Sequence, residues 1–154
     1  MTHEAMTSSK NPNWATPLYV FDPLHAEFRF DVDLCATADN TKCPIFIDPD
    51  TDSLSVPWHT YGRVGWCNPP YDKKGTSRKF VAKAVEERQH GFTTVLLLAA
   101  RTDTRLFHDY LWDGQAHHPR TGVSLRFFSG RIVFEGATAG ALFPSMLAIV
   151  HAST

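Results

Sequence analysis

A proline-rich turn, Asn68-Pro69-Pro70-Tyr71, is the segment of the sequence best suited to chemistry. It directly follows a short apolar segment, residues 63–67 (RVGWC), which predicts a buried strand. Two successive prolines fix two φ angles, remove two backbone donors and keep the residues before them out of helical geometry. The sequence therefore predicts a rigid turn at the end of a strand, where open α/β sheets bind ligands.

The groups in this turn suit the handling of a planar amino group. An adenine amine is a poor nucleophile because its lone pair is delocalised into the ring. The Asn68 side-chain oxygen and the Pro69 carbonyl can each accept one amine hydrogen, and both bonds strengthen as the nitrogen becomes tetrahedral and positive. We expect Tyr71 to stack on the base, which has to be flipped out of duplex DNA to arrive there. An ordinary loop or a proline-rich recognition segment is the alternative interpretation.

The segments around the turn predict an α/β fold. Residues 93–100 form a continuous apolar run, typical of a strand covered on both faces. Residues 76–90 have the spacing of an amphipathic helix, and Gly91 is a suitable C-cap. Further strands are predicted at 28–36, 42–47, 63–67, 124–128, 131–135 and 142–150, with a loop at 48–53 and a short helix from an Asp103 cap to Trp112. Because Ser129-Gly130 can join 124–128 to 131–135, we expect a mostly parallel sheet with an antiparallel C-terminal hairpin.

The bulk composition predicts one soluble domain. The 154 residues are 43% hydrophobic, which is enough for one core. We expect residues 1–13 to form a flexible tail and residues 14–154 to form the domain. Residues 1–10 lack the apolar core of a signal peptide, and no stretch approaches the roughly 20 apolar residues of a spanning helix. With three cysteines and no CxxC pair, these features predict a cytoplasmic protein with reduced thiols and no membrane partner.

Charge is unevenly distributed along the chain. Residues 1–71 carry nine acidic and four basic side chains, whereas residues 72–131 carry eleven basic and six acidic ones. Both halves are compatible with ordinary solvated surface. They are equally compatible with an acidic half that binds a cationic cofactor and a basic half that binds phosphates. On the second interpretation, the candidate DNA contacts are Lys73, Lys74, Arg78, Arg101 and Arg131.

Other kinds of site find little support in the sequence. The eight histidines show no ligand spacing, and the adjacent His117 and His118 would point in opposite directions in a strand. No GxSxG turn is present, and no cysteine has a histidine at a spacing that would indicate a nucleophile and its general base. We therefore expect neither a metal centre nor a covalent enzyme intermediate.

The turn at residues 68–71 resembles the catalytic motif of amino-methylating DNA methyltransferases. The wider pattern is similar to the phage-type DNA N-6-adenine methyltransferases, the Dam family of phages and prophages, over roughly residues 14–150. The matching segments are WATP at 14–17, FDVDLCA at 30–36, NTKC at 40–43, DSL at 52–54 with Trp58, LLLAARTDTRLF at 96–107 and GRIVF at 130–134.

This resemblance implies a single-domain class I methyltransferase with a Rossmann-like sheet and S-adenosylmethionine as its cofactor. Thr16-Pro17 would border the methionine end of the cofactor, and Asp33 would lie near its amino group. Asp52 would meet its adenine, with Leu54 packed on it, although either acid is also compatible with a capping or turn role. The full set of implied cofactor residues is Trp14, Thr16, Pro17, Asp33, Ala36, Asp52 and Leu54.

The chain departs from most methyltransferases in one turn. Those proteins carry a glycine-rich turn after the first strand, which lets the backbone approach the cofactor. Here residues 36–39 read ATAD, and no glycine precedes Gly62. The resemblance therefore does not extend to the glycine-rich turn through which most methyltransferases approach the cofactor.

The resemblance further implies the reaction and its setting. Catalysis would be direct in-line methyl transfer to the N-6 amine of adenine in double-stranded DNA, with Asn68, Pro69, Pro70 and Tyr71 as catalytic residues. Gly130-Arg131 matches a family motif, which makes Arg131 the first of the candidate DNA contacts. The protein would act as a monomer or homodimer in the cytoplasm of a bacterial host, encoded by a phage or prophage. Two alternatives stay open: a methyltransferase acting on RNA or protein amino groups, and a non-catalytic DNA-binding accessory protein with a degenerate site.

Overall fold

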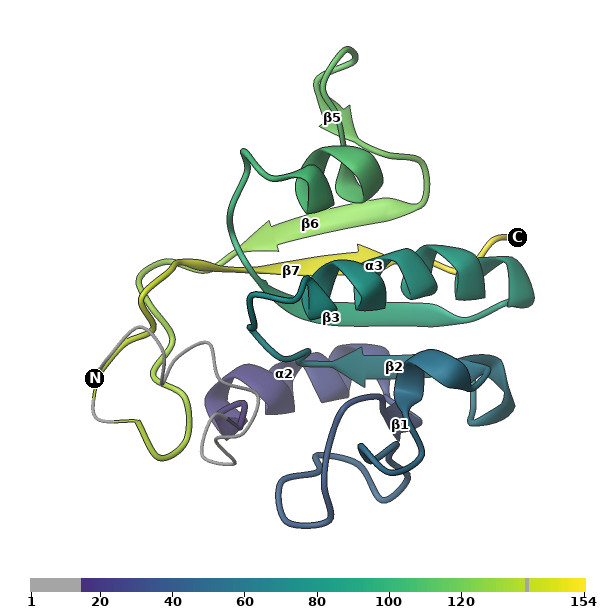
Figure 1. The fold of residues 1–154 in the computed structure, drawn as a ribbon, viewed down its shortest axis with the longest axis vertical. Coiled ribbons are helices and arrows are strands. Elements are labelled where there is room, and N and C mark those ends of the chain that lie inside the picture. The colour runs from purple at the N-terminus through teal and green to yellow at the C-terminus, as the bar shows by residue number, and fades with distance from the viewer. Residues whose placement is uncertain (1–14, 138) are drawn as a thin grey trace.

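The computed structural model describes residues 15–137 and 139–154, which are built around a five-stranded sheet (Figure 1). The sheet consists of β1 (Val32–Asp33), β2 (Val64–Cys67), β3 (Thr93–Ala99), β6 (Val123–Phe127) and β7 (Ser145–Val150), in the order β1-β2-β3-β7-β6. β1, β2 and β3 run parallel, whereas β7 runs antiparallel to its neighbours β3 and β6. The sheet is mostly parallel with one reversed strand, which confirms the predicted α/β class.

The remaining elements are helices and short turns outside the sheet. They are α2 (Leu18–Phe28), α3 (Thr76–Glu87), the 3₁₀ turns Ser53–Ser55, Trp58–Thr60 and Arg88–His90, the π-helical turn Phe107–Leu111, and a two-stranded ribbon of β4 (Trp112–Asp113) and β5 (His118–Pro119). The ribbon projects from the end of the molecule that also carries β6 (Figure 1). No helix among the described residues is long and apolar enough to cross a membrane.

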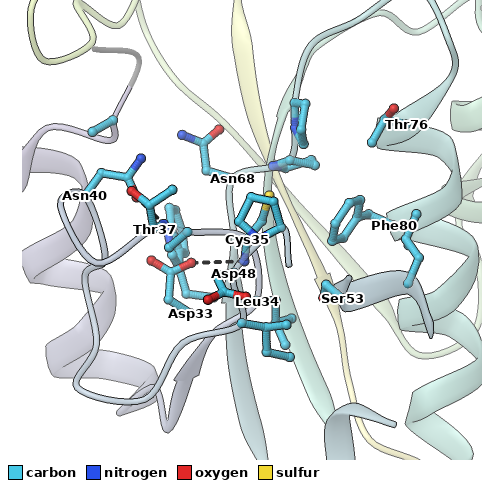
Figure 2. Close-up of a pocket in the computed structure, with 18 of the residues that line it drawn as sticks. Asp33, Leu34, Cys35, Thr37, Asn40, Asp48, Ser53, Asn68, Thr76 and Phe80 are labelled. Carbon is cyan, nitrogen blue, oxygen red and sulfur yellow. Dashed lines mark hydrogen bonds between the residues drawn. The ribbon is translucent and has the colours of Figure 1, made fainter. Parts of the chain in front are cut away.

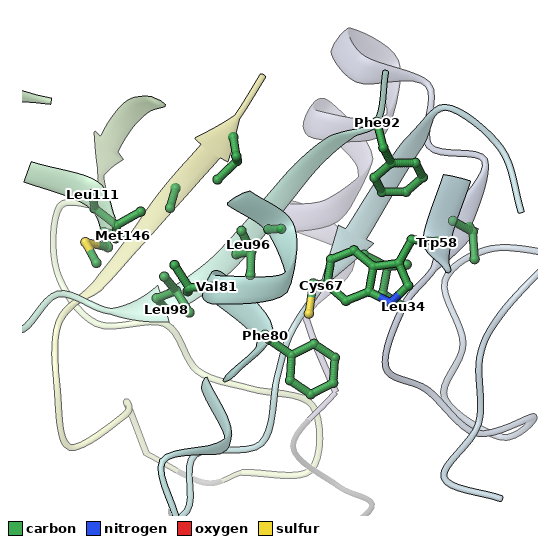
Figure 3. Packing of buried hydrophobic residues seen from close by; sticks show 14 of the residues in the cluster. Leu34, Trp58, Cys67, Phe80, Val81, Phe92, Leu96, Leu98, Leu111 and Met146 are labelled. Atoms are coloured by element: carbon green, nitrogen blue, oxygen red, sulfur yellow. The ribbon is translucent and has the colours of Figure 1, made fainter. Parts of the chain in front are cut away.

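The two long helices cover opposite faces of the sheet, and β3 packs against both. Leu96 and Leu98 belong to the buried cluster that includes the apolar face of α3, whereas Val95 and Leu97 belong to the cluster that includes α2. Figure 3 shows Leu96 and Leu98 beside Val81 of α3. Successive side chains of a strand point to opposite faces, so a strand covered on both sides is apolar throughout. The predicted strand at 93–100 is confirmed.

Strand β2 leads directly into the Asn68–Tyr71 turn, as predicted. Trp66 and Cys67 are fully buried. Gly65 is required by close packing, because a Cβ there would lie 2.7 Å from the Phe92 ring and 2.8 Å from Leu34. β2 pairs with β1 on one side and β3 on the other, so its carboxyl end lies at the centre of the parallel part of the sheet.

The N-terminal half differs from the prediction in two places. The pattern did not predict α2, which ends at Phe28 with Arg29 in the left-handed conformation at φ 54°. The predicted strand at 28–36 is therefore reduced to β1. The predicted strand at 42–47 forms an isolated bridge between Phe46 and Asp33 instead of a ladder. Pro44 lacks the N–H that a ladder needs, which accounts for this irregular edge.

The C-terminal half differs from the prediction as well. Residues 131–135 form no strand, and Ser129-Gly130 does not close a hairpin, because β6 pairs with β7 instead. The short helix that follows β3 is not capped by Asp103 either: the Thr104 hydroxyl accepts a hydrogen bond from the Phe107 amide at 3.3 Å. Its predicted end, Trp112, lies in β4.

The helix predicted at 76–90 is confirmed. α3 ends at Glu87 and continues as the turn Arg88–His90, and Gly91 caps it at φ 78°. At the other end, the Asp72 carboxylate accepts hydrogen bonds from the Lys74 and Thr76 amides at 3.0 and 3.2 Å. Burial alone would raise the pKa of Asp72, but its hydrogen bonds with Thr76 and Lys74 outweigh it and keep that pKa below its ordinary value. The start of α3 is thereby fixed five residues after Tyr71, the end of the turn.

Candidate active site

A cleft of about 480 Å³ opens at the carboxyl ends of β1 and β2. Figure 2 shows Asn68, Asp33 and Phe80 on different sides of it. The cleft brings together most of the site residues predicted from the sequence, although they come from four separate segments of the chain. Those among its lining residues are Thr16, Asp33, Ala36, Asp52, Leu54, Asn68, Pro69, Pro70, Tyr71 and Lys74.

Two of the predicted cofactor residues stand apart from this set. Trp14 lies outside the described residues. Pro17 is buried but is not among the lining residues; it is the N-cap of α2, and its carbonyl accepts the first backbone hydrogen bonds of that helix. Its role in the described part of the chain is to begin α2.

The turn is attached to neighbouring elements at both ends. The Asn68 side-chain nitrogen donates a hydrogen bond of 3.1 Å to the Thr16 hydroxyl oxygen. The Ser77 hydroxyl, in the first turn of α3, donates to the Pro70 carbonyl at 3.0 Å. No described residue donates a hydrogen bond to the Pro69 carbonyl. The segment of residues 68–71 is therefore held at both ends and lines the cleft.

Tyr71 contributes ring surface to the cleft rather than a free hydroxyl. Its hydroxyl donates to the Leu97 carbonyl in β3 at 3.0 Å, and burial raises its pKa far above the usual range. The ring packs against Phe143 at a centroid distance of 5.0 Å and against Phe134 at 6.1 Å. The hydroxyl stays neutral and bound to the sheet, so any contact that Tyr71 makes across the cleft has to be through its ring.

Asp33 places a buried carboxylate at the end of β1. Its side chain is 3% exposed and accepts hydrogen bonds from the backbone amides of Cys35 and Lys42 at 3.3 and 3.0 Å. Burial raises the pKa of Asp33 to about 6 in spite of these bonds. None of the ion pairs among the described residues includes it. A cation in the cleft would stabilise the charged form of this carboxylate.

Two further acids line the same cleft. Asp52, with φ 60°, accepts from the Leu54 amide at 3.3 Å and caps the turn Ser53–Ser55. Asp48 was not predicted as a site residue; its carboxylate accepts from the Thr51 amide at 2.9 Å, and this hydrogen bond lowers its pKa. Asp52 thus has the capping role that was one of its two interpretations, and it also faces the cleft with Asp48.

With this geometry in place, comparison with known proteins assigns the chain to a family. The family model for DNA N-6-adenine-methyltransferase (Dam) matches residues 4–145. The chain belongs to the Dam family. It is 36% identical over 110 residues to the DNA N-6-adenine-methyltransferase of Haemophilus phage HP1 (strain HP1c1), covering 70% of this chain and 61% of that protein. It is 33% identical over 95 residues to the DNA N-6-adenine-methyltransferase of Escherichia phage T1, covering 61% of this chain and 38% of that protein.

The family assignment confirms the resemblance drawn from the sequence motifs. The matched regions span only part of each relative, about three fifths of the first and two fifths of the second. The family match includes every segment that lines the cleft.

A turn without glycine follows β1 in this Dam-family chain. The Asn40 side-chain oxygen accepts from the Thr37 amide at 2.8 Å, and the Thr41 amide donates to the Thr37 carbonyl at 2.9 Å. Thr37, Asn40 and the half-buried Lys42 all line the cleft. Side-chain and backbone hydrogen bonds within residues 37–41 therefore hold the turn in place of a glycine-rich backbone.

The sequence pattern missed several other cleft residues. Ile47 and Phe80 form apolar walls of the cleft, and Cys35, which precedes the turn of residues 37–41, lines it as well. Burial, together with the charge of Asp33, raises the pKa of Cys35 to about 12, so its thiol stays protonated and is a poor nucleophile. Phe80, on the apolar face of α3, belongs to the buried core and also forms a wall of the cleft.

The five side chains predicted to contact DNA differ in the partners that they already have within the protein. Lys74 is exposed and lines the cleft, and Lys73 precedes it on the same exposed loop. Arg101, just beyond β3, is exposed with its guanidinium 5.7 Å from the centroid of the Phe143 ring. Arg131 is exposed and donates to the Ala141 carbonyl at 3.1 Å. Arg78 is held by Asp109 at 2.7 Å, so its charge is already partly compensated.

The ligand sets that metal ions require are not found among the described residues. Among residues 15–137 and 139–154, no group of three or more His, Cys, Asp or Glu side chains is arranged to hold a metal ion. The cleft instead combines the amides of Asn40 and Asn68, carboxylates, the amines of Lys42 and Lys74, and apolar walls.

Proposed function

We propose that the chain is an adenine-specific DNA methyltransferase that transfers a methyl group from S-adenosylmethionine to the N-6 amine of adenine in double-stranded DNA. The observation that carries this proposal is that the Asn68–Tyr71 turn and the buried carboxylate of Asp33 line one cleft. Membership of the Dam family and the similarity to the DNA N-6-adenine-methyltransferases of phages HP1 and T1 support the same reaction. The parallel strands β1 to β3, with a helix on each face, support a single-domain class I, Rossmann-like fold.

The cleft fits S-adenosylmethionine in size and chemistry. Its volume of about 480 Å³ falls within the 300–1,000 Å³ typical of cofactor sites. Asp33 offers a buried carboxylate to the cofactor's amino group, and Asp48 and Asp52 offer acceptors for hydroxyl groups. Ile47 and Phe80 provide apolar surface for an adenine ring. When bound, the cofactor supplies an electrophilic methyl group on a positively charged sulfur.

The turn would stabilise the charge that develops on the target amine. The Asn68 oxygen and the Pro69 carbonyl would each accept a hydrogen bond from one N–H group of the amine. Each such bond to a charged group stabilises the transition state by about 1.5–3 kcal/mol, or one to two powers of ten in rate. As the methyl group passes to the amine and the cofactor is left as a neutral thioether, the Asn68 oxygen and the Pro69 carbonyl would hold the N–H groups of the amine until it releases one proton to solvent. The Tyr71 ring stacks on the flipped base.

Exposed basic side chains near the cleft would hold the DNA backbone. Lys73 and Lys74 follow the turn, Arg101 follows β3, and Arg131 lies on the connection between β6 and β7. Arg78 contributes less because Asp109 already pairs with it. We propose that residues 14–154 act as one domain, as a monomer or homodimer, in the cytoplasm of a bacterial host.

Labelled methyl transfer tests this function. The purified chain is incubated with methyl-labelled cofactor and, separately, duplex DNA, RNA and a mixed peptide pool. We expect label only on the N-6 of DNA adenine and at least a hundredfold lower turnover for Asn68→Ala, about the effect of losing an oxyanion-hole-type contact. Gln89→Ala, which removes an exposed amide, serves as the control and retains activity. Label on RNA or peptide, an unchanged Asn68→Ala rate, or no calorimetric binding of the cofactor would each contradict the proposal.

A further inference from the structure

Thr16 is a buried and firmly held hydrogen-bond acceptor beside the catalytic turn. Its side chain is 2% exposed, and its hydroxyl oxygen accepts from the Asn68 side-chain nitrogen at 3.1 Å. The backbone is fixed on both sides of it. The Ala15 carbonyl accepts from the Glu135 amide at 2.9 Å, and the Pro17 carbonyl accepts from two first-turn amides of α2 at 3.0 and 3.1 Å. A β-branched side chain on such a backbone has few rotamers.

The Asn68 amide needs a partner of this kind to perform its proposed task. An amide carries an acceptor and a donor on one rotatable group. If its nitrogen faced the target amine, two donors would oppose each other and the bond would be lost. The prolines fix the backbone of the turn but leave the side-chain torsions of Asn68 free. The hydrogen bond to Thr16 engages the nitrogen end, which directs the oxygen end away from Thr16.

We propose that Thr16 is a positioning residue that holds the Asn68 amide by its nitrogen, so that its oxygen is the end turned to the target amine. The inference rests on the proposed function, because it presumes that Asn68 accepts from an adenine amine. It assigns Thr16 a role that differs from a contact with the methionine end of the cofactor. A cofactor contact acts on cofactor affinity, whereas a positioning residue acts on turnover through Asn68.

Three single variants separate these roles. Thr16→Val keeps the volume and the branched shape but removes the polar atom, whereas Thr16→Ser keeps the hydroxyl. Thr94→Val is the matched control, because Thr94 is fully buried in β3 and its hydroxyl has no hydrogen-bond partner among the described residues. We expect Thr16→Val to lower kcat about tenfold, or 1.4 kcal/mol, with KM for cofactor and DNA within about twofold. Thr16→Ser should stay within about threefold of the unmodified chain and Thr94→Val within about twofold.

A double variant tests whether Thr16 acts through Asn68. If it does, Thr16→Val combined with Asn68→Ala is no slower than Asn68→Ala alone, because the side chain to be positioned is already gone. Multiplying losses would overturn the inference. So would a Thr16→Val variant with unchanged kinetics, or one in which KM for the cofactor rises at unchanged kcat.

A readout that does not depend on turnover completes the test. The side-chain amide signal of Asn68 in a ¹⁵N spectrum is identified by its disappearance in Asn68→Ala. We expect Thr16→Val to shift this signal and to speed its hydrogen exchange, and Thr94→Val to leave it in place; an unaffected signal in Thr16→Val overturns the inference. If the unmodified chain transfers no methyl group, the proposed function fails and the catalytic part of the inference fails with it. The amide signal then still decides whether Thr16 holds the side chain.

Discussion

Replacing Asp33 by asparagine removes the buried negative charge at the end of β1 while keeping the size of the side chain. The folded-state pKa of Asp33 is about 6, against an ordinary value of 3.8, because burial disfavours the charged form. A difference of about two units corresponds to about 3 kcal/mol between the protonation states. Because the pKa of Asp33 is higher in the folded state than in the unfolded state, the protonated side chain favours folding. This contribution to the free energy of unfolding is complete below pH 4 and is lost as the pH rises through 6.

This linkage fixes the expected size and direction of the effect. Between pH 4.5 and 7.5, the free energy of unfolding of the unmodified chain should fall by about 2 kcal/mol relative to that of Asp33→Asn. The variant also loses an acceptor for the Lys42 amide, which costs about 1–3 kcal/mol at every pH. The absolute stability at one pH is therefore uninformative, and the pH dependence of the difference carries the test.

The assay is urea unfolding at pH 4.5, 6.0 and 7.5, followed by the fluorescence of the buried tryptophans Trp58 and Trp66. Asp50→Asn, which removes a carboxylate at an exposed loop position, serves as the control and is measured at the same three pH values. A stability difference between Asp33→Asn and the unmodified chain that stays within about 0.5 kcal/mol over this range would refute the reasoning. Calorimetry at pH 7.5 should show loss of cofactor binding in Asp33→Asn alone.

Three further predictions concern packing, the turn and DNA. Gly65→Ala should lower the free energy of unfolding by about 1–3 kcal/mol in a urea titration, since its Cβ would clash with Phe92; an unchanged midpoint would contradict this. Tyr71→Phe keeps the ring and loses the bond to Leu97, so stability should fall by about 1 kcal/mol while KM for DNA stays within about twofold; a KM as high as that of Tyr71→Ala would show that the ring alone is insufficient. Arg101→Ala should reduce the slope of log affinity for DNA against log salt by about one, and an unchanged slope would remove Arg101 from the phosphate contacts.

Strand β3 and helix α3, which position the site, were predictable because their local pattern follows directly from burial. β3 is apolar at every position from Val95 to Ala99, as expected of a strand covered on both faces, and α3 shows the spacing and the C-terminal glycine of an amphipathic helix. The turn at 68–71 was predictable because two prolines leave the backbone few conformations. Each of these features is encoded within a few neighbouring residues.

The incorrect predictions arose where the same pattern has two physical causes. Ile132 and Phe134 alternate with exposed residues as in a strand, yet they are buried against the α2 side of the sheet without pairing to a strand. Alternation reports which side chains are buried and does not report where the backbone hydrogen bonds go. Asp48 was missed for a related reason: its position in the cleft depends on how the loop of residues 48–52 folds beside β1.

The turn derives its chemical use from being attached to three different elements. Proline restricts φ, but it cannot orient Asn68 or Tyr71. Those side chains are held by the residues leading into α2, through Thr16, and by β3, through the Leu97 carbonyl, while Ser77 holds the Pro70 carbonyl from α3. Since α2 and α3 lie on opposite faces of the sheet, the turn keeps its shape only when both helices are packed. On the proposed function, in which Asp33 and the loops beside β1 bind the cofactor, we expect loss of core packing far from the cleft to reduce turnover before it abolishes cofactor binding.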